Sequence, residues 1–582
     1  MKRFAVLIAA ALWLAGSIAS VRGDEALLRA IPDDALGLVV VNHLADTAKK
    51  IEAIGAKVNA PLPSLLPTLK AIIGLTAGLD EQGTVGVAIM PQEDAESPPA
   101  IMIFVPVTDY GQLVAGMMPE DAQAEIISGR LAGKPVMVTQ KGKFAVFARP
   151  TDESVLKHVK SATRGITSEV RPLGDWLREN DLAALALPKG VRRAVDLMQQ
   201  GIAQAKEKLP ADQEALKPAL AMFELLSRSG DTIREELTHA GLGVRINSEK
   251  DLLVSSQVAF KSGGKFSQAV TDAKWPRIAG LDNLPGDHYF LALSGAIPAG
   301  WSHGLIQAGM EMAKLGANTP ASKLSKEQIE RLFKLSGKSM QGVEGMAMVL
   351  PAPRHHRASL ITSARGVMVV DDTETYLKNY AETLRGFADL ADENADAPLP
   401  TYEIAEIEVA GEKGFEVKMD MSKAFKGQDL NNPGVEAVYQ KFIEAIYGLG
   451  GKMTVCLAAA NEHTIAMTYD NKHSLESLIQ AIRKREPGLG QDEEIVSSNK
   501  LLPEAAAWKM YISPAGTVDF ANWLLGKFGN QAIILPGFPD TPPLVAGVNF
   551  TSTGAEGRLA LPSRLIDGIG EYVTKIRQIQ NQ

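Results

Sequence analysis

Cysteine is almost absent from this chain, since Cys456 is the only one among 582 residues. No intramolecular disulfide can form, so the folded state depends on the burial of apolar side chains. Cys456 lies in the strand-like run 453–457, and a free thiol in such a run is usually a small buried apolar residue. We therefore predict that Cys456 is buried and unreactive.

Concentrated positive charge is missing as well. The 60 Lys and Arg residues are outnumbered by 68 Asp and Glu residues, which gives a formal net charge of −8. No basic tract interleaved with aromatic residues occurs along the chain. Nucleic acids and anionic membrane surfaces both require clustered Lys and Arg. The composition therefore argues against both classes of partner.

Long apolar runs are confined to the beginning of the sequence. Two basic residues precede an apolar run over 4–15 and a stretch of small residues, a pattern typical of a secretory signal. We expect residues 1–23 to be a signal peptide, with cleavage after Ala19 or after Gly23. The mature chain is then periplasmic or extracellular. No later stretch approaches the length of a membrane span, about 18 apolar residues, so we expect no transmembrane segment.

Motifs for metal binding are scarce. The nine histidines include no pair at the helical i, i+4 spacing of zinc proteases. His355 and His356 form the only cluster, between Arg354 and Arg357. Adjacent residues on an extended backbone point to opposite faces and rarely bind one metal together. A solvated loop is the expected structure, and a metal or anion contact is the alternative.

Sequence motifs for nucleotide binding and for acyl transfer are incomplete or absent as well. The run Ser336–Ser339 ends like a phosphate loop, but Leu332 occupies the position of its first glycine. No Gly-x-Ser-x-Gly nucleophile elbow is found. The sequence leaves enzymatic activity open, favours a protein without catalytic residues, and gives no reason to expect a cofactor.

What the chain does contain is internal recurrence. A strand followed by Pro-x-Gly and an amphipathic helix occurs at Pro188–Gly190, Pro298–Gly300 and Pro514–Gly516. Proline ends a strand because it lacks an N–H, and glycine permits the turn into the helix. The recurrence predicts one building unit used several times.

Strands of alternating apolar residues form a second recurring feature. Their two-residue period and hairpin-length loops predict antiparallel pairs with a buried face, each pair being followed by a helix. The pairs are expected at 85–89 with 101–107, 242–246 with 252–260, 346–350 with 358–364, and 546–550 with 558–561. A further hairpin is expected in the middle of each half, from 125–139 with 143–148 in the first half and from 402–421 and 453–469 in the second.

These features together predict an α+β fold made by tandem duplication. Each unit is β-α-β-β-α, with antiparallel strands and helices packed on one face of the sheet. Two such units and a central hairpin make up each half, and the halves are 24–280 and 281–582. A comparable plan in both halves is the main structural expectation from the sequence.

The mature start resembles a family of known proteins. Leu28-Arg-Ala-Ile-Pro32-Asp-Asp-Ala35, followed by an apolar strand, is similar to the opening of a loose group of large exported bacterial proteins of unknown function, frequent in planctomycetes. The resemblance implies export and a repeated α+β layout. It implies no catalytic residues, because the group has no established activity.

Three functions remain compatible with these features. The first is an exported non-catalytic protein that binds or scaffolds a partner outside the cytoplasm. The second is a carrier of a lipid or another apolar molecule in a groove between sheet and helices, and the third is an exported hydrolase whose site is assembled from distant segments. Methionines more often fill a core, but because they are flexible they also suit an apolar site, and the candidates for it are Met117, Met118, Met310, Met346 and Met348.

Overall fold

A computed structural model describes the chain from Glu25 to Gln580 with internal gaps. The gaps are 60–65, 68–69, 71–76, 95–96, 120, 132, 209–216, 274, 277, 287, 299–300, 302–303, 305, 308, 311–323, 354–357, 395–398, 423–432 and 529–533. The predicted signal peptide lies outside the described residues. Two compact units are present: unit 1 comprises Met1–Gln200, Gly230–Gln268 and Phe550–Thr574, and unit 2 comprises Gly201–Ser229, Ala269–Asn549 and Lys575–Gln582.

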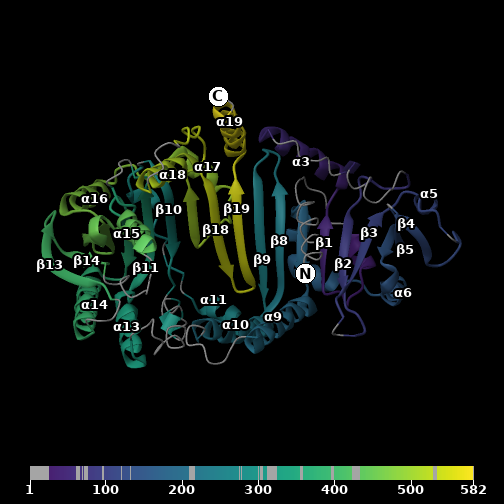
Figure 1. Cartoon of the computed structure of the whole chain (residues 1–582), viewed down its shortest axis with the longest axis horizontal. Helices are drawn as coiled ribbons and strands as arrows, with labels where there is room; N and C mark the ends of the chain where they lie inside the picture. Colours follow the sequence, from purple (N-terminus) through teal and green to yellow (C-terminus); the bar gives the residue numbers. More distant parts are fainter. Residues whose placement is uncertain are drawn as a thin grey trace. The chain divides into compact units, whose positions relative to one another are not determined.

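Unit 1 contains an antiparallel sheet (Figure 1). Its strands, in order across the sheet, are β4 (Ile127–Leu131), β5 (Lys134–Lys141), β6 (Phe144–Ala148), β3 (Ala100–Pro106), β2 (Val85–Met90), β1 (Gly37–Val41), β7 (Leu182–Ala186), β8 (Leu237–Ile246), β9 (Leu252–Phe260) and β19 (Gly554–Leu561). Most of them are rich in apolar residues and bounded by turn residues, as expected for strands of a packed sheet.

The helices associated with these strands are mostly short. They are α2 (Glu25–Ala30), α3 (Leu44–Lys57), α5 (Tyr110–Ala115), α6 (Glu153–Ser161), α7 (Thr167–Val170), α8 (Gly174–Glu179), α9 (Pro188–Lys208), α10 (Lys217–Glu236) and α11 (Lys265–Asp272). Pro188 and Gly190 stand at the start of α9, directly after β7, as the Pro-x-Gly pattern predicts. Proline suits this position because the first helical N–H has no partner within the helix.

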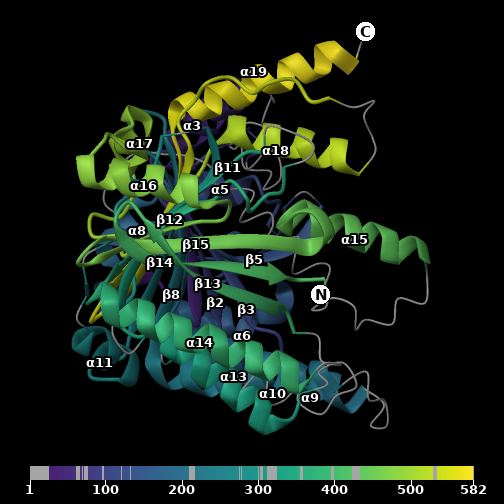
Figure 2. The same ribbon diagram turned by 90° about the vertical axis from the view of Figure 1, so that its left-hand side faces the viewer.

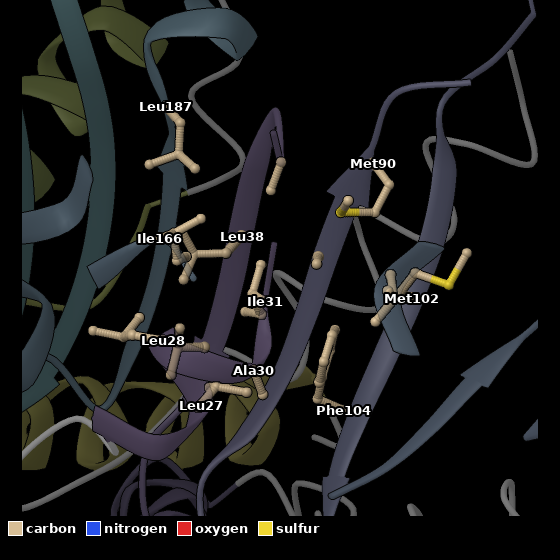
Figure 3. Close-up of a cluster of buried hydrophobic side chains, with 14 of the residues drawn as sticks. Leu27, Leu28, Ala30, Ile31, Leu38, Met90, Met102, Phe104, Ile166 and Leu187 are labelled. Atoms are coloured by element: carbon tan, nitrogen blue, oxygen red, sulfur yellow. The ribbon is translucent and has the colours of Figure 1, made fainter. Parts of the chain in front are cut away.

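One face of the unit 1 sheet is covered by the short helices. Figure 3 shows Leu27 and Leu28 of α2 beside Leu38 of β1, with Phe104 of β3 in the same cluster. Leu27 and Leu38 are 1% exposed and Phe104 is fully buried. Full burial of such a side chain contributes about 1.5–3 kcal/mol, so this cluster is a principal source of the stability of unit 1.

The strands of unit 2 also pair antiparallel. In order, they are β13 (Thr401–Val409), β14 (Glu412–Asp420), β15 (Lys452–Asn461), β16 (Thr464–Thr468), β12 (Arg365–Val370), β11 (Val343–Pro351), β10 (Tyr289–Ala296), β17 (Trp508–Ile512) and β18 (Leu544–Thr551). Of the two segments predicted for the central hairpin, 402–421 contains the pair β13–β14 and 453–469 contains the pair β15–β16.

Longer helices accompany this sheet. They are α13 (Lys326–Ser339), α14 (Thr373–Glu393), α15 (Pro433–Tyr447), α16 (Lys472–Lys484), the shorter α17 (Glu493–Asn499) and α18 (Pro514–Lys527). Helix α19 (Ser563–Gln580), the last one described, belongs to unit 1 as far as Thr574. Asp372 and Ser513 cap α14 and α18 by accepting backbone N–H bonds. Such caps satisfy N–H groups that otherwise have no partner at a helix start.

The structure confirms the α+β class and corrects two details of the prediction. Helices pack on both faces of the sheets, not on one. In unit 1, α2 covers Leu38, whereas α3 packs against Val41 on the opposite face of the same strand. In Figure 2, α14 lies below β13, β14 and β15, and α16 lies above them. The reason is that consecutive residues of many strands are apolar, so neither face suits water.

The second correction concerns the strand expected at 358–364, since the paired strand is β12 at 365–370. The backbone N–H groups of Leu360 and Ile361 instead donate to the carbonyl oxygens of Ala445 and Ile446, at the C-terminal end of α15. These two hydrogen bonds give the N–H groups of Leu360 and Ile361 partners outside a β-sheet. The alternating pattern alone did not separate the two segments.

Candidate functional site

In unit 2, one face of the sheet is apolar and only partly covered. Side chains alternate along a strand, so residues directly opposite each other on paired strands share a face. Leu293 of β10 lies opposite Met348 of β11 and Met510 of β17. The residues that share this face and are partly exposed are Leu291, Leu293, Met346, Met348, Met368, Trp508, Met510, Ile512, Leu544, Ala546 and Val548. We call this set the open face of unit 2.

The opposite side of the same strands is closed. Ala292 and Val349 are fully buried, Ala347 and Tyr511 are 1% exposed, and Val545 is fully buried. These residues alternate with those of the open face, so the difference does not come from strand position. The difference in exposure arises because other elements cover one face of the strands fully and the other face only in part.

Unit 1 has the same two-sided arrangement. Its open face is formed by the apolar, partly or fully exposed residues Val39, Val87, Ile89, Ile101, Ile103, Ala184, Ala186, Leu242 and Val244. Leu242 is 42% exposed, whereas Leu38, Ala88 and Met102 on the other side are at most 1% exposed. Isolated apolar residues on a surface are ordinary, but a contiguous patch commonly marks an interaction site.

Helix α3 covers one end of the open face of unit 1. Leu44, Ala48 and Ile51 pack against Val41 and Leu182, at the ends of β1 and β7. The middle of the face, around Val39, is left partly exposed. Val39 and Val244 pack in part against this cluster, so α3 bounds the patch on one side.

Aromatic side chains of α14 border the open face of unit 2. Tyr376 Oη donates to Met368 Sδ at 3.5 Å, and the rings of Tyr376 and Tyr380 stack at 5.9 Å between centroids. Burial raises the pKa of both phenols above the usual value of 10. Both rings therefore stay neutral at physiological pH, and this border of the face carries no charge.

The methionines predicted to form an apolar site lie in different environments. Met346 and Met348 come together on the open face of unit 2. Met117 is fully buried in a core cluster of unit 1, and Met118 beside it is 78% exposed. Met310 is partly buried in unit 2. The structure thus brings together two of the five, and their role in binding stays a prediction.

Two methionines of the open face of unit 2 were not predicted from the sequence as candidates for an apolar site. Met368 and Met510 share the face of Met346 and Met348. Met510 lies in the apolar alternation 508–512, whereas Met368 lies in the continuous apolar run 367–370. The alternation was a usable signal. Which strands become neighbours decides whether such residues meet, and that depends on the sheet order.

Chemically reactive groups are sparse in the part of the chain that the structure describes. No three His, Cys, Asp or Glu residues come together there as a metal-binding group. His355 and His356 lie outside the described residues. Cys456 is free and fully buried, and burial raises the pKa of its thiol to about 11. Within the described residues, no helix has the length and apolar character needed to span a bilayer.

Neither a family model, a curated protein nor a solved structure matches the chain.

Proposed function

We propose that this chain is an exported, non-catalytic binding protein whose ligand is an apolar molecule held against the open faces. The observation that carries the proposal is the contrast between the two sides of single strands. Along β11, the side chains of Ala347 and Val349 are buried. Met346 and Met348, which alternate with them, are partly exposed. Scaffolding of a protein partner through the same faces is an outcome that the test below distinguishes.

The energetics suit an extended hydrocarbon. Each methylene removed from water contributes about 0.8 kcal/mol, and an alkyl chain of a dozen carbons therefore outweighs the several kcal/mol lost on association. Methionine side chains adapt to irregular ligands because they are unbranched and flexible. The open face of unit 2 contains four of them and no ionisable residue.

We infer in addition that the chain arose by tandem duplication, with halves 24–280 and 281–582. The support is the matching order of strands. Unit 1 reads β4-β5-β6-β3-β2-β1-β7-β8, and unit 2 reads β14-β15-β16-β12-β11-β10-β17-β18. Each strand occupies the corresponding place in its sequence order, and β13 is an addition. Duplication accounts for an open face in both units.

The test uses the full mature chain and diphenylhexatriene, a hydrocarbon that fluoresces when removed from water. We expect saturable binding. Met348→Lys places a charge in the middle of the open face of unit 2 and should weaken binding at that unit about tenfold, equivalent to about 1.4 kcal/mol. Met118→Lys is the matched control, because Met118 is 78% exposed and lies outside the open face.

Folding is checked by circular dichroism and by thermal unfolding. Met510→Lys, on the neighbouring part of the same face, provides a second variant if Met348→Lys unfolds. The proposal is wrong if the native chain does not bind the hydrocarbon, or if both open-face variants bind it as well as Met118→Lys. Capture of a protein, without any uptake of hydrocarbon, would favour scaffolding.

A further inference from the structure

A buried hydrogen-bond donor without an acceptor lies on α18. Trp523 is 4% exposed, and its Nε1 has no hydrogen-bond partner among the described residues. A buried donor left without an acceptor destabilises the fold, and most buried polar groups in folded proteins have a hydrogen-bond partner, from the protein or from ordered water. Trp523 therefore points to an acceptor supplied by another molecule.

Neighbouring polar groups of α18 are already paired. Asn522 donates to the carbonyl oxygen of Leu535 at 2.9 Å and accepts from its N–H at 2.7 Å. Asp519 lies 2.8 Å from His288 Nε2. Neither side chain accepts a hydrogen bond from Trp523, whose N–H is the free donor of this group.

A positive charge accompanies the free donor. Lys527 Nζ lies 5.7 Å from the centre of the Trp523 ring, within cation–π range. No carboxylate forms an ion pair with Lys527 among the residues that the structure describes. An N–H donor beside an unpaired ammonium is suited to an oxygen that is both an acceptor and negatively charged.

The pair is connected to the open face of unit 2 by aromatic rings. Phe290 directly precedes Leu291 of the open face, and its ring stacks on Phe520 at 4.9 Å. Phe520 in turn contacts Trp523 at 5.6 Å. The rings of Phe290, Phe520 and Trp523 thus form an apolar row from the start of β10 to the donor and the charge.

We propose that the ligand is a long-chain carboxylate. This proposal rests on the proposed function of the open face. Its hydrocarbon chain lies on the open face of unit 2, and its carboxylate accepts from Trp523 Nε1 beside Lys527 Nζ. Because the nitrogen is buried, the carboxylate reaches it when a side chain over the ring moves. The Lys527 side chain is the one that the structure positions there.

The test compares three fluorescent probes on the full mature chain: cis-parinaric acid, its methyl ester, and diphenylhexatriene. Trp523→Phe retains a ring and removes the N–H, and Lys527→Gln removes the charge. Hydrogen bonds to charged groups contribute about 1.5–3 kcal/mol, so each variant should weaken binding of the acid at least about tenfold. Diphenylhexatriene should bind all variants equally, and Lys527→Gln should leave the ester unaffected.

Lys500→Gln, at another exposed lysine of unit 2, is the control for loss of charge. The assignment is overturned if the acid binds wild type, Trp523→Phe and Lys527→Gln equally while diphenylhexatriene still binds. It is also overturned if a monomeric phospholipid displaces the acid more strongly than palmitate does. If none of the three probes binds wild type, the proposed function itself fails, and the assignment fails with it.

Discussion

The backbone of Gly190 lies so close to the carbonyl oxygen of Leu36 that a Cβ atom at position 190 would overlap this oxygen. Gly516 has the same relationship to the carbonyl oxygen of Tyr289. Both glycines belong to Pro-x-Gly segments, and both face the beginning of the central strand of their unit, β1 or β10. The glycine in this pattern is needed for a close approach of backbone to backbone, in addition to the turn.

Gly190→Ala is therefore expected to destabilise unit 1. Insertion of a methyl group into packed backbone typically costs about 1–3 kcal/mol, and urea unfolding monitored by circular dichroism measures it. Gly201→Ala in the same helix is the control, because no atom lies within 4 Å of its added Cβ. There alanine should stabilise by about 0.4–1 kcal/mol. Equal effects of the two substitutions would contradict the close approach.

Two neighbouring valines of β1 test the difference between the faces. Val40 is 1% exposed on the closed face, whereas Val39 is partly exposed on the open face. Val40→Ala should lower the free energy of unfolding by about 2 kcal/mol, and Val39→Ala by less than half of that. Val39→Ala should in turn reduce diphenylhexatriene binding more than Val40→Ala does. If Val39→Ala lowered the free energy of unfolding more than Val40→Ala, or reduced diphenylhexatriene binding less, the assignment of the open and closed faces in unit 1 would be wrong.

Unfolding should depend on pH through His239. This residue is 4% exposed, with Nε2 2.8 Å from the carbonyl oxygen of Glu169. Burial lowers its pKa below the usual 6.5. The unfolded chain then binds more protons as the pH falls through 6.5, so the free energy of unfolding decreases on acidification and is fully retained at higher pH.

The measurement is a series of urea titrations between about pH 7.5 and pH 5, with a limiting slope of about 1.4 kcal/mol per pH unit for a single group. His239→Gln should flatten the dependence relative to wild type. An unchanged slope in this variant would show that another group is responsible.

Cys456 provides a measure of unfolding in unit 2. Its side chain is fully buried, and burial raises the pKa of the thiol to about 11. Only the thiolate reacts with disulfide reagents, so the native protein should react with Ellman's reagent at least about a hundredfold more slowly than the urea-unfolded chain. Rapid reaction of the native protein at pH 8 would contradict this burial.

Much of the strand pattern could be predicted from local sequence. The alternation in 85–89 and 242–246 corresponds to β2 and β8, and the Pro-x-Gly segments at 188 and 514 begin α9 and α18. These features depend on neighbours within a few residues, and the physical preferences of proline, glycine and alternating apolar residues act at that range. The displaced strand after 351 shows the limit, because contacts with α15 decided its conformation.

A further recurrence became visible only with the structure. Ile31, Leu284 and Leu502 each precede a proline and the strands β1, β10 and β17, and each is at most 4% exposed. In two of the segments a turn follows the proline, because the N–H of Ala35 or Ala506 donates a hydrogen bond to the carbonyl oxygen of the proline. The surrounding sequences differ enough that equivalent burial, rather than identity, reveals the pattern.

The sequence by itself determined where many of the strands lie, that the single cysteine cannot form an intramolecular disulfide, and that motifs for metal and nucleotide binding are almost absent. It did not determine which side of each sheet is closed. Leu38 and Val39 are both apolar, and only the packing of α2 over the first distinguishes them. Alternation is a local property, whereas coverage results from contacts between distant segments, and for that reason the open faces and the unpaired donor of Trp523 follow from the tertiary structure.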